Sequence, residues 1–371
     1  MNKYVLGIDQ STQGTKGLLF DEKGALLCRA DLPHKQYIDE RGWVEHDPEE
    51  IYANTLQVVK NLIEKAGIDK KEISVLGISN QRETALVWDK KTGKPVYNAV
   101  VWQCARGSEI CKKIAAEHEN AEELVRSHTG LQLSPYFSAA KIAWVLQNVP
   151  GAQEKADRGE LCCGTIDSWL VYKLTGGREF RTDYSNASRT QMFHIGELAW
   201  DSEVCGLFGI PVSCLAEVTD SDGEYGTTDF GGYLDAQIPI RGVLGDSHGA
   251  LFGQGCIETG MIKTTYGTGS SIMMNIGKKP VYSNRVVTSL AWKLDGEVNY
   301  VLEGNINYTG AVITWLKDDL KLIASPGETE ALAFEANPCI SGSGVYRTWS
   351  TLLGQRGRGN SHRNDQNDKK S

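Results

Sequence analysis

The stretch from residue 4 to residue 21 constrains the fold most, because two short apolar runs flank a polar, glycine-bearing turn. The first run, residues 4–8, has the length of a strand and leads directly into Asp9. Hydroxyl and amide side chains and Gly14 follow, and then a second apolar run at residues 17–20. The pattern predicts a β-hairpin whose tip offers backbone N–H groups and hydroxyls to an anion. An ordinary hairpin with a solvated tip explains this stretch, taken alone, equally well.

Two charged side chains of this stretch suit a ligand that carries phosphate. The carboxylate of Asp9, at the end of a buried strand, is a suitable ligand for Mg²⁺, a hard cation that prefers oxygen atoms. Lys16 supplies a positive charge for a phosphate group. The hairpin therefore indicates a nucleotide site as one of its two interpretations.

Composition and charge argue against several classes of function. The chain has 371 residues, enough for two domains, and a formal net charge of −8, which argues against a nucleic-acid-binding surface. No apolar run approaches the roughly 20 residues that span a bilayer, and the first residues lack the pattern of a secretory signal. The nine cysteines are scattered without a CxxC pair. This spacing predicts reduced thiols in a cytoplasmic protein.

Two helices can be predicted from their capping residues. Asp47 and Pro48 predict the start of the first helix, because an aspartate caps the free N–H groups and proline suits the first helical position. Gly67 predicts its end. A second helix over residues 168–174 is expected to be capped by Asp167.

Two neighbouring charged residues are candidates for binding a substrate. Arg82 and Glu83 follow a predicted buried strand at residues 73–78. They form either a structural ion pair, which the residues alone favour, or a fork in which the guanidinium donates to hydroxyl groups and the carboxylate accepts. Taken alone, Trp102 is expected to be a core residue, and Tyr136 is expected to be half-buried packing at a loop-to-helix junction.

The order of strand, acid and small residues begins again near residue 240. A predicted strand at residues 240–244 ends in Gly245 and Asp246, and residues 261–274 predict a second glycine-rich hairpin. Phosphorylation of an alcohol requires a group that accepts the hydroxyl proton. Asp246 is the residue we expect in this role, and the alternative is an acid that ends a strand for solubility.

Six motifs in order resemble those of the FGGY carbohydrate kinases, most closely of the glycerol kinase branch. The first hairpin is also similar to the phosphate-binding hairpin of the wider sugar kinase, actin and Hsp70 ATPase superfamily, and the resemblance covers roughly residues 3–338. The motifs are Gln-Arg-Glu-Thr at 81–84, Asn-Ala-Val-Val-Trp-Gln at 98–103, Ser-Pro-Tyr-Phe-Ser at 134–138, Asp-Tyr-Ser-Asn-Ala-Ser-Arg-Thr at 183–190, Gly-Asp at 245–246 and Thr-Tyr-Gly-Thr-Gly at 265–269.

The resemblance implies a fold and a domain organisation. The fold is α/β, a two-domain actin-like ATPase of the ribonuclease H-like kind, with an incomplete second domain. The first domain is expected at residues 1–245 and the start of the second at residues 246–338. Residues 339–371 form a tail outside the family pattern.

The resemblance also implies an activity, the transfer of the γ-phosphate of ATP to a primary hydroxyl of glycerol or a related polyol. Asp246 would be the catalytic base and Asp9 would position Mg²⁺. The implied substrate-binding residues are Arg82, Glu83, Trp102, Tyr136, Asp246 and Ser247. The implied ATP-binding residues are Thr12, Gln13, Lys16, Thr268, Gly269 and Gly310. The motif at residues 183–190 receives no chemical role.

Two departures from the family pattern concern the substrate. Ser247 stands where the glycerol kinases carry glutamine, and Ser271 stands where they usually carry a bulky residue. Smaller side chains at both positions are consistent with a longer polyol or a ketopentose. The alternatives are therefore a pentulose kinase of the xylulokinase kind, a non-catalytic polyol-binding remnant, and an actin-like filament protein. A homo-oligomer is compatible with the sequence.

From residue 339 onward the family pattern ends. Residues 354–371 contain no apolar residue beyond glycine, which predicts disorder. One interpretation is a basic, flexible interaction tail. We prefer another, because a shift of one nucleotide in permitted codons restores a sequence that resembles what the family has next. This predicts a frameshifted, truncated chain, and since catalysis requires both substrates to be positioned, we expect it to be weakly active or inactive.

Overall fold

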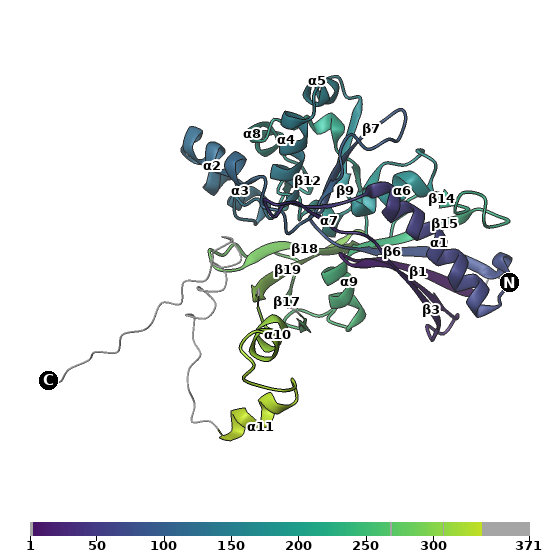
Figure 1. Cartoon of the computed structure of the whole chain (residues 1–371). Coiled ribbons are helices and arrows are strands. Elements are labelled where there is room, and N and C mark those ends of the chain that lie inside the picture. Colours follow the sequence, from purple (N-terminus) through teal and green to yellow (C-terminus); the bar gives the residue numbers. More distant parts are fainter. Residues whose placement is uncertain (1–2, 268, 307, 336–371) are drawn as a thin grey trace. The chain divides into compact units, whose positions relative to one another are not determined.

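The chain divides into two compact units. The structure is a computed structural model, and it describes residues 3–267, 269–306 and 308–335 (Figure 1). One unit comprises residues 1–263 and 273–303, and the other comprises residues 264–272 and 304–371. The predicted tail from residue 339 lies outside the described residues. The boundary expected between residues 245 and 246 falls inside the first unit and stays a prediction.

The first unit is built on a six-stranded sheet with the strand order β14-β15-β6-β1-β2-β3. β1 pairs antiparallel with β2, as the predicted hairpin requires, and parallel with β6, which in turn pairs parallel with β15. Figure 1 shows β1, β6 and β15 side by side. The bounds are β1 (Tyr4–Gln10), β2 (Gly14–Phe20), β3 (Leu26–Pro33), β6 (Ile73–Asn80), β14 (Thr227–Thr228) and β15 (Ile238–Gly245).

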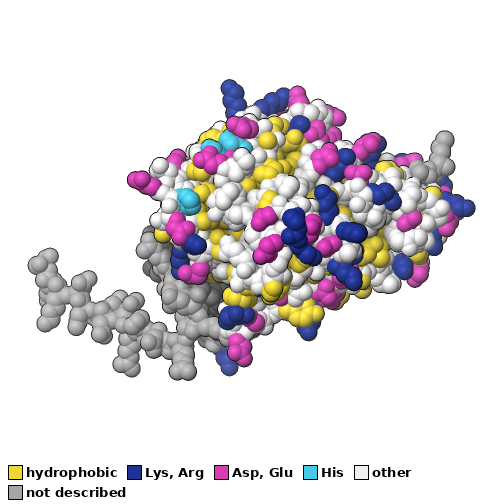
Figure 2. Space-filling view, turned by 90° about the horizontal axis from the view of Figure 1, so that it is seen from above, with side chains coloured by type: hydrophobic (Ala, Val, Ile, Leu, Met, Phe, Trp, Pro, Cys, Tyr) yellow, Lys and Arg dark blue, Asp and Glu magenta, His cyan; other side chains and the backbone are white. Residues whose placement is uncertain are grey.

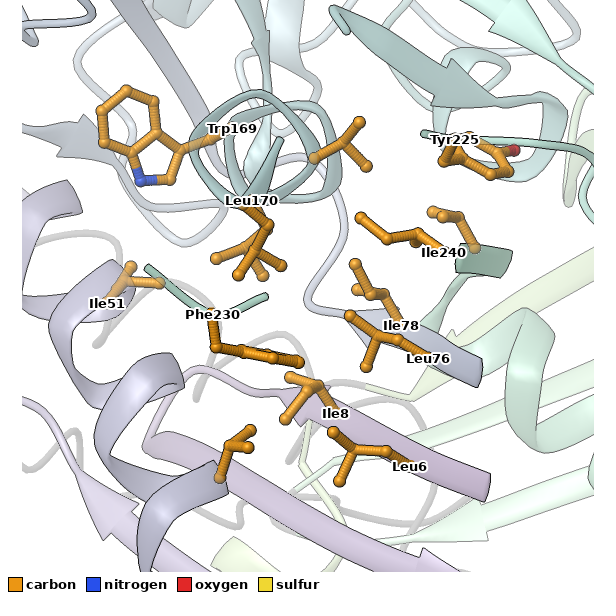
Figure 3. Packing of buried hydrophobic residues seen from close by; sticks show 14 of the residues in the cluster. Leu6, Ile8, Ile51, Leu76, Ile78, Trp169, Leu170, Tyr225, Phe230 and Ile240 are labelled. Atoms are coloured by element: carbon orange, nitrogen blue, oxygen red, sulfur yellow. The ribbon is translucent and has the colours of Figure 1, made fainter. Parts of the chain in front are cut away.

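Helix α1 (Pro48–Ala66) packs on this sheet and begins and ends as predicted. The Asp47 carboxylate accepts the N–H of Glu49, and Gly67 ends the helix with a φ of 65°. Its apolar face is buried with side chains of β1, β6 and α6 (Ile166–Leu174). Figure 3 shows Ile51 of this helix in the same cluster as Leu6, Ile8, Leu76, Ile78, Trp169 and Leu170. Full burial of one such aliphatic side chain contributes about 1.5–3 kcal/mol to the free energy of folding. This cluster therefore stabilises the packing of the sheet that carries the loops at its edge.

The cap predicted for α6 is wrong. Thr165 is the N-cap residue, and it forms a capping box with Ser168. Asp167 lies inside the helix and is buried, where its carboxylate accepts hydrogen bonds from the hydroxyls of Thr165 and Thr182. The tertiary contact with Thr182 therefore decides the role of Asp167.

A five-stranded sheet with the order β4-β5-β8-β7-β9 forms the other half of the first unit. Its strands are β4 (Tyr37–Ile38), β5 (Val44–His46), β7 (Ala85–Asp89), β8 (Ala99–Val100) and β9 (Leu161–Thr165). Five helices accompany it, namely α2 (Ser108–Glu117), α3 (Ala121–Thr129), α4 (Ser138–Asn148), α5 (Ala152–Asp157) and α8 (Ser202–Leu207). A second apolar cluster lies between this sheet and these helices.

Short elements complete the first unit. They are η1 (Lys70–Glu72), β10 (Arg181–Asp183), α7 (Tyr184–Ala187), β11 (Phe193–His194), β12 (Ala199–Trp200), η2 (Val212–Cys214), β13 (Glu217–Thr219) and α9 (Asp246–Gly253). β10 pairs with β13, and β11 pairs with β12.

A four-stranded sheet with the order β16-β17-β19-β18 follows α9. β16 (Ile262–Tyr266) and β17 (Ser270–Gly277) are neighbours in it, as the second predicted hairpin requires, and β18 (Val287–Leu294) pairs antiparallel with β19 (Glu297–Ile306). The second unit contains the helices α10 (Gly310–Asp318) and α11 (Glu328–Glu335). Among the described residues, no helix combines the length and apolarity that crossing a membrane requires.

Candidate active site

The candidate site lies at one edge of the six-stranded sheet. In the parallel ladders Gln10 is paired with Asn80, and Asn80 with Gly245, so β1, β6 and β15 end side by side. The predicted residues Asp9, Arg82 and Asp246 therefore come from neighbouring strand ends. Open α/β sheets bind their ligands at this carboxyl edge.

Asp9 already has two polar partners at this edge. The register of the hairpin sets Asp9 opposite Lys16, whose ammonium lies 2.8 Å from Oδ2. The hydroxyl of Ser79 donates to Oδ1 at 3.2 Å. A carboxylate with a hydroxyl beside it provides oxygen ligands that suit Mg²⁺.

Trp102 contacts the tip of the first hairpin, whereas the side chain of Gln13 at this tip is exposed. The indole N–H of Trp102 donates to the hydroxyl of Thr12 at 2.9 Å, and the partly buried ring packs against the second apolar cluster. Gly14 has no room for a side chain, because a Cβ there would lie 2.4 Å from the carbonyl oxygen of Leu32. Thr12 and Trp102 are thus fixed together.

A buried network of four charged residues lies behind Asp246. Arg82 donates to both carboxylate oxygens of Glu303, at 2.9 and 2.8 Å. Arg189 lies 2.5 Å from Glu83 and 3.0 Å from Glu303. The Nε of Arg82 is 4.0 Å from Glu83, so the expected direct pair is replaced by separate partners for each residue.

This network changes the acidity of the carboxyl groups that it contains or touches. Burial alone would raise the pKa of Glu303, but the guanidinium groups of Arg82 and Arg189 hold it well below its usual value. Partial burial of Asp246, whose side chain is 41% exposed, raises its pKa, and Arg82, whose Nε lies 3.4 Å from Oδ1, opposes this increase. The carboxylate of Asp246 is therefore a stronger base than an ordinary aspartate.

The backbone around Asp246 presents its carboxylate toward solvent. Asp246 is the first residue of α9, its side chain is 41% exposed, and the N–H of Ser247 donates to Oδ1 at 2.6 Å. A helix N-terminus favours a negative charge. Gly245 makes room for Arg82, because a Cβ at this position would lie 2.8 Å from Cγ and Cδ of that side chain. The N–H of Gly245 donates to the hydroxyl of Ser185 at 2.9 Å.

Tyr136 lies against Trp102 on the other side of the site. Their rings meet edge to face with centroids 5.7 Å apart, and burial raises the pKa of Tyr136, which keeps its hydroxyl protonated. The ammonium of Lys141 donates to the carbonyl oxygens of residues 135, 136 and 137, at 2.6, 2.5 and 3.1 Å. Glu83 has a φ of 60°, and its carbonyl oxygen accepts the hydroxyl of Ser138. Backbone strain of this kind concentrates at functional sites.

The sequence-predicted residues of the first unit thus fall into two connected groups. Arg82 contacts Asp246 directly and Glu83 more distantly, and Ser247 contacts Asp246. Trp102 joins Thr12 to Tyr136. The sequence assigned no chemical role to Glu303, which only continues the family match, or to Arg189. The signal for Arg189 was the motif at residues 183–190, which had no role, and no local signal pointed to Glu303 as the partner of Arg82.

Three predicted nucleotide residues lie outside the first unit. Thr268 is outside the described residues. Within the second unit, the N–H of Gly310 donates to the carbonyl of Gly267 at 2.9 Å, and the N–H of Gly267 donates to the carbonyl of Gly269. Gly269 and Gly310 therefore lie at one turn of that unit.

A separate group of potential metal ligands consists of His128, His194 and Asp201, whose ligand atoms lie within 4.8 Å of one another. These side chains already serve other contacts. The carboxylate of Asp201 caps α8, and its Oδ2 lies 2.6 Å from Nδ1 of His128. Nδ1 of His194 accepts hydrogen bonds from two backbone N–H groups. Imidazole nitrogens do not suit Mg²⁺, so this group is unrelated to the role expected of Asp9.

The α/β architecture and the charged residues at the sheet edge are those of a protein with the actin-like ATPase fold. A sequence model described as the FGGY family of carbohydrate kinases, N-terminal domain, matches residues 4–253. The chain belongs to this family. The predicted family, α/β fold class and carbohydrate kinase class are therefore confirmed.

The sequences of two relatives align with most of this chain. Glycerol kinase 1 of Thermotoga maritima is 52% identical over 344 residues, which cover 92% of this chain and 69% of that protein. The glycerol kinase of Carboxydothermus hydrogenoformans is 51% identical over 332 residues, which cover 89% of this chain and 66% of that protein. This chain thus spans about two thirds of these relatives.

Solved structures give the same coverage. The crystal structure of Plasmodium falciparum glycerol kinase with ADP has a TM-score of 0.83 and 36% identity, over 90% of this chain and 66% of that one. A ligand-bound xylulose kinase from Lactobacillus acidophilus has a TM-score of 0.78, 20% identity and the same coverage. The second likeness concerns the fold alone.

Proposed function

We propose that this chain transfers the γ-phosphate of ATP to a primary hydroxyl of glycerol or a related polyol. The observation that carries the proposal is the position of Asp246, which is open to solvent and in contact with an arginine that is itself fixed by a buried carboxylate. A carboxylate within hydrogen-bonding distance of the attacking hydroxyl accepts its proton as the bond to phosphorus forms. The names of the relatives, which are glycerol kinases, support the same substrate class.

The substrate would lie between the two groups of residues in the first unit. Arg82 and Glu83 would orient its hydroxyls, since a guanidinium donates and a carboxylate accepts. The Trp102 and Tyr136 rings supply an apolar wall for the carbon chain, and the hydroxyl of Tyr136 can donate to oxygen. Ser247, beside the base, contributes little bulk. Fixed binding groups of this kind lower the entropic barrier of the transfer.

The residues proposed to bind the phosphates of ATP come from both units. Thr12, Gln13 and Lys16 are the phosphate ligands proposed from the first hairpin, and Thr268, Gly269 and Gly310 are those proposed from the second unit. Asp9 would hold Mg²⁺, which neutralises phosphate charge when bound. The oxygen atoms of Asp9 and Ser79 fit this cation.

Other properties stay predictions. They are the cytoplasmic location, the lack of nucleic-acid binding, and a homo-oligomeric state. On the face that Figure 2 shows, acidic and basic side chains are intermixed. The frameshift and its expected consequence, weak or absent activity, also stay predictions.

The proposal is tested by measuring ADP release from ATP and Mg²⁺ by the whole chain with glycerol, a four-carbon polyol and D-xylulose. Turnover that is highest with glycerol supports the proposal, whereas preference for D-xylulose supports a pentulose kinase, which the small side chain of Ser247 favours. Calorimetric binding of glycerol without ADP release indicates a non-catalytic polyol-binding protein. ATP-dependent polymers in sedimentation would indicate a filament protein instead.

A further inference from the structure

Lys263 on β16 is a buried cation without a hydrogen-bonding partner. Its side chain is 5% exposed, and among the residues that the structure describes, its ammonium makes no hydrogen bond and has no carboxylate at ion-pair distance. An ammonium carries three donors, and an unpaired polar group in the interior costs free energy. A ligand that is not part of the protein would remove this cost.

The charges around Lys263 belong to the candidate active site. Arg82, Glu303 and Asp246 are the charged groups whose fields act on its ammonium. Burial, and then Arg82, lowers the pKa of Lys263, whereas the two carboxylates act in the opposite direction. The position therefore favours an additional negative charge.

The other cations of the site already have carboxylate partners. Arg82 is bound through both Nη atoms by Glu303, and Arg189 lies between Glu83 and Glu303. Together with Lys263 and Asp246 the cluster holds three cations and three carboxylates, so its formal charge is zero while Asp246 is ionised. When Asp246 accepts the proton of a substrate hydroxyl, the formal charge of the cluster becomes +1. Lys263 is the cation of this cluster without a direct carboxylate partner.

We propose that Lys263 binds the phosphoryl group of the phosphorylated polyol. The inference deepens the proposed function and rests on it. A phosphate monoester carries up to two negative charges, and lysine binds phosphate as a compact point charge. The group would be drawn toward Lys263 at the moment when Asp246 becomes neutral. Lys263 would then discriminate between the polyol and its phosphate ester.

The experiment is calorimetric titration of the full chain and its Lys263→Met variant with glycerol, glycerol 3-phosphate, inorganic phosphate and ADP. We expect the variant to bind glycerol 3-phosphate at least about tenfold more weakly, as loss of a hydrogen bond to a charged group implies, and to bind glycerol and ADP unchanged. Lys278→Met is the matched control, because Lys278 is 66% exposed and pairs with Glu297 at the surface. This control should bind all four ligands like the wild type.

Thermal stability separates a ligand-binding role from a structural one. Because Lys263→Met removes an unpartnered ammonium from the interior, the variant should melt at the same or a higher temperature than the wild type. A melting temperature that falls would show a structural role and overturn the proposal. Lys263→Arg, which keeps the charge, should retain part of the phosphate-ester affinity.

The remaining outcomes are distinct. Unchanged affinity of Lys263→Met for glycerol 3-phosphate overturns the proposal, and so does an equal loss for ADP, which would assign the anion to the nucleotide. If the wild type binds inorganic phosphate but not glycerol, the proposed polyol function is refuted. The role of Lys263 is then tested by comparing the affinities of the wild type and of Lys263→Met for inorganic phosphate. A wild-type chain that binds neither phosphate probe also overturns the proposal.

Discussion

Replacing Glu303 by glutamine should destabilise the first unit strongly. Glu303 is fully buried, accepts both Nη groups of Arg82 and contacts Arg189 at 3.0 Å. Glutamine has a similar shape but no charge, so it leaves two buried guanidinium groups with reduced compensation. Removal of one partner from a buried ion pair costs about 3–5 kcal/mol, a large part of a total stability of about 5–15 kcal/mol.

The assay is urea unfolding of the wild type and of the Glu303→Gln variant, followed by tryptophan fluorescence. Glu297→Gln is the matched control, because Glu297 lies on the same strand, is 65% exposed and pairs with Lys278 at the surface. An exposed pair contributes less than about 1 kcal/mol, so this control should unfold almost like the wild type. A loss for Glu303→Gln as small as that of the control would refute the reasoning about the buried network.

Two further predictions concern packing and pH. Gly245→Ala should weaken glycerol binding about tenfold or more, because its Cβ would displace the side chain of Arg82, whereas calorimetry should detect no change for Gly253→Ala, where nothing lies within 4 Å. Burial and then His34 lower the pKa of His46 from 6.5 to about 4, so the unfolded chain binds more protons between these values and stability should fall as the pH decreases through this window. Urea unfolding at pH 7 and pH 5 should show a smaller loss for His46→Gln than for the wild type, and equal losses would exclude this origin.

The elements that carry the site could be predicted from the sequence because their signals are local. An apolar run followed by an acid gave the ends of β1 and β15, and both strands are present. The ends of α1 followed from Asp47 and Gly67, whose capping effects involve only neighbouring residues. Because both strands run parallel to β6, which lies between them, Asp9 and Asp246 must lie at one edge of the sheet.

The partners of the site residues could not be predicted in this way. Arg82 binds Glu303, which is 221 positions away, and nothing in either local pattern specifies that contact. The neighbouring Glu83 was the obvious partner by sequence, but its positive φ turns it toward Arg189. The residue type of Trp102 suggests a place in the core, and only the tertiary fold brings its indole N–H to the hydroxyl of Thr12.

The central claim is that Asp246 is the base of a phosphoryl transfer to a polyol. The most direct measurement is the transfer of labelled γ-phosphate from ATP to glycerol by the whole chain and by its Asp246→Asn variant, with circular dichroism to compare their folds. The account predicts labelled glycerol phosphate from the wild type and a rate about 10²–10⁴-fold lower for the variant, with glycerol affinity largely kept. Equal rates for the two proteins, or label released only as inorganic phosphate, would contradict it.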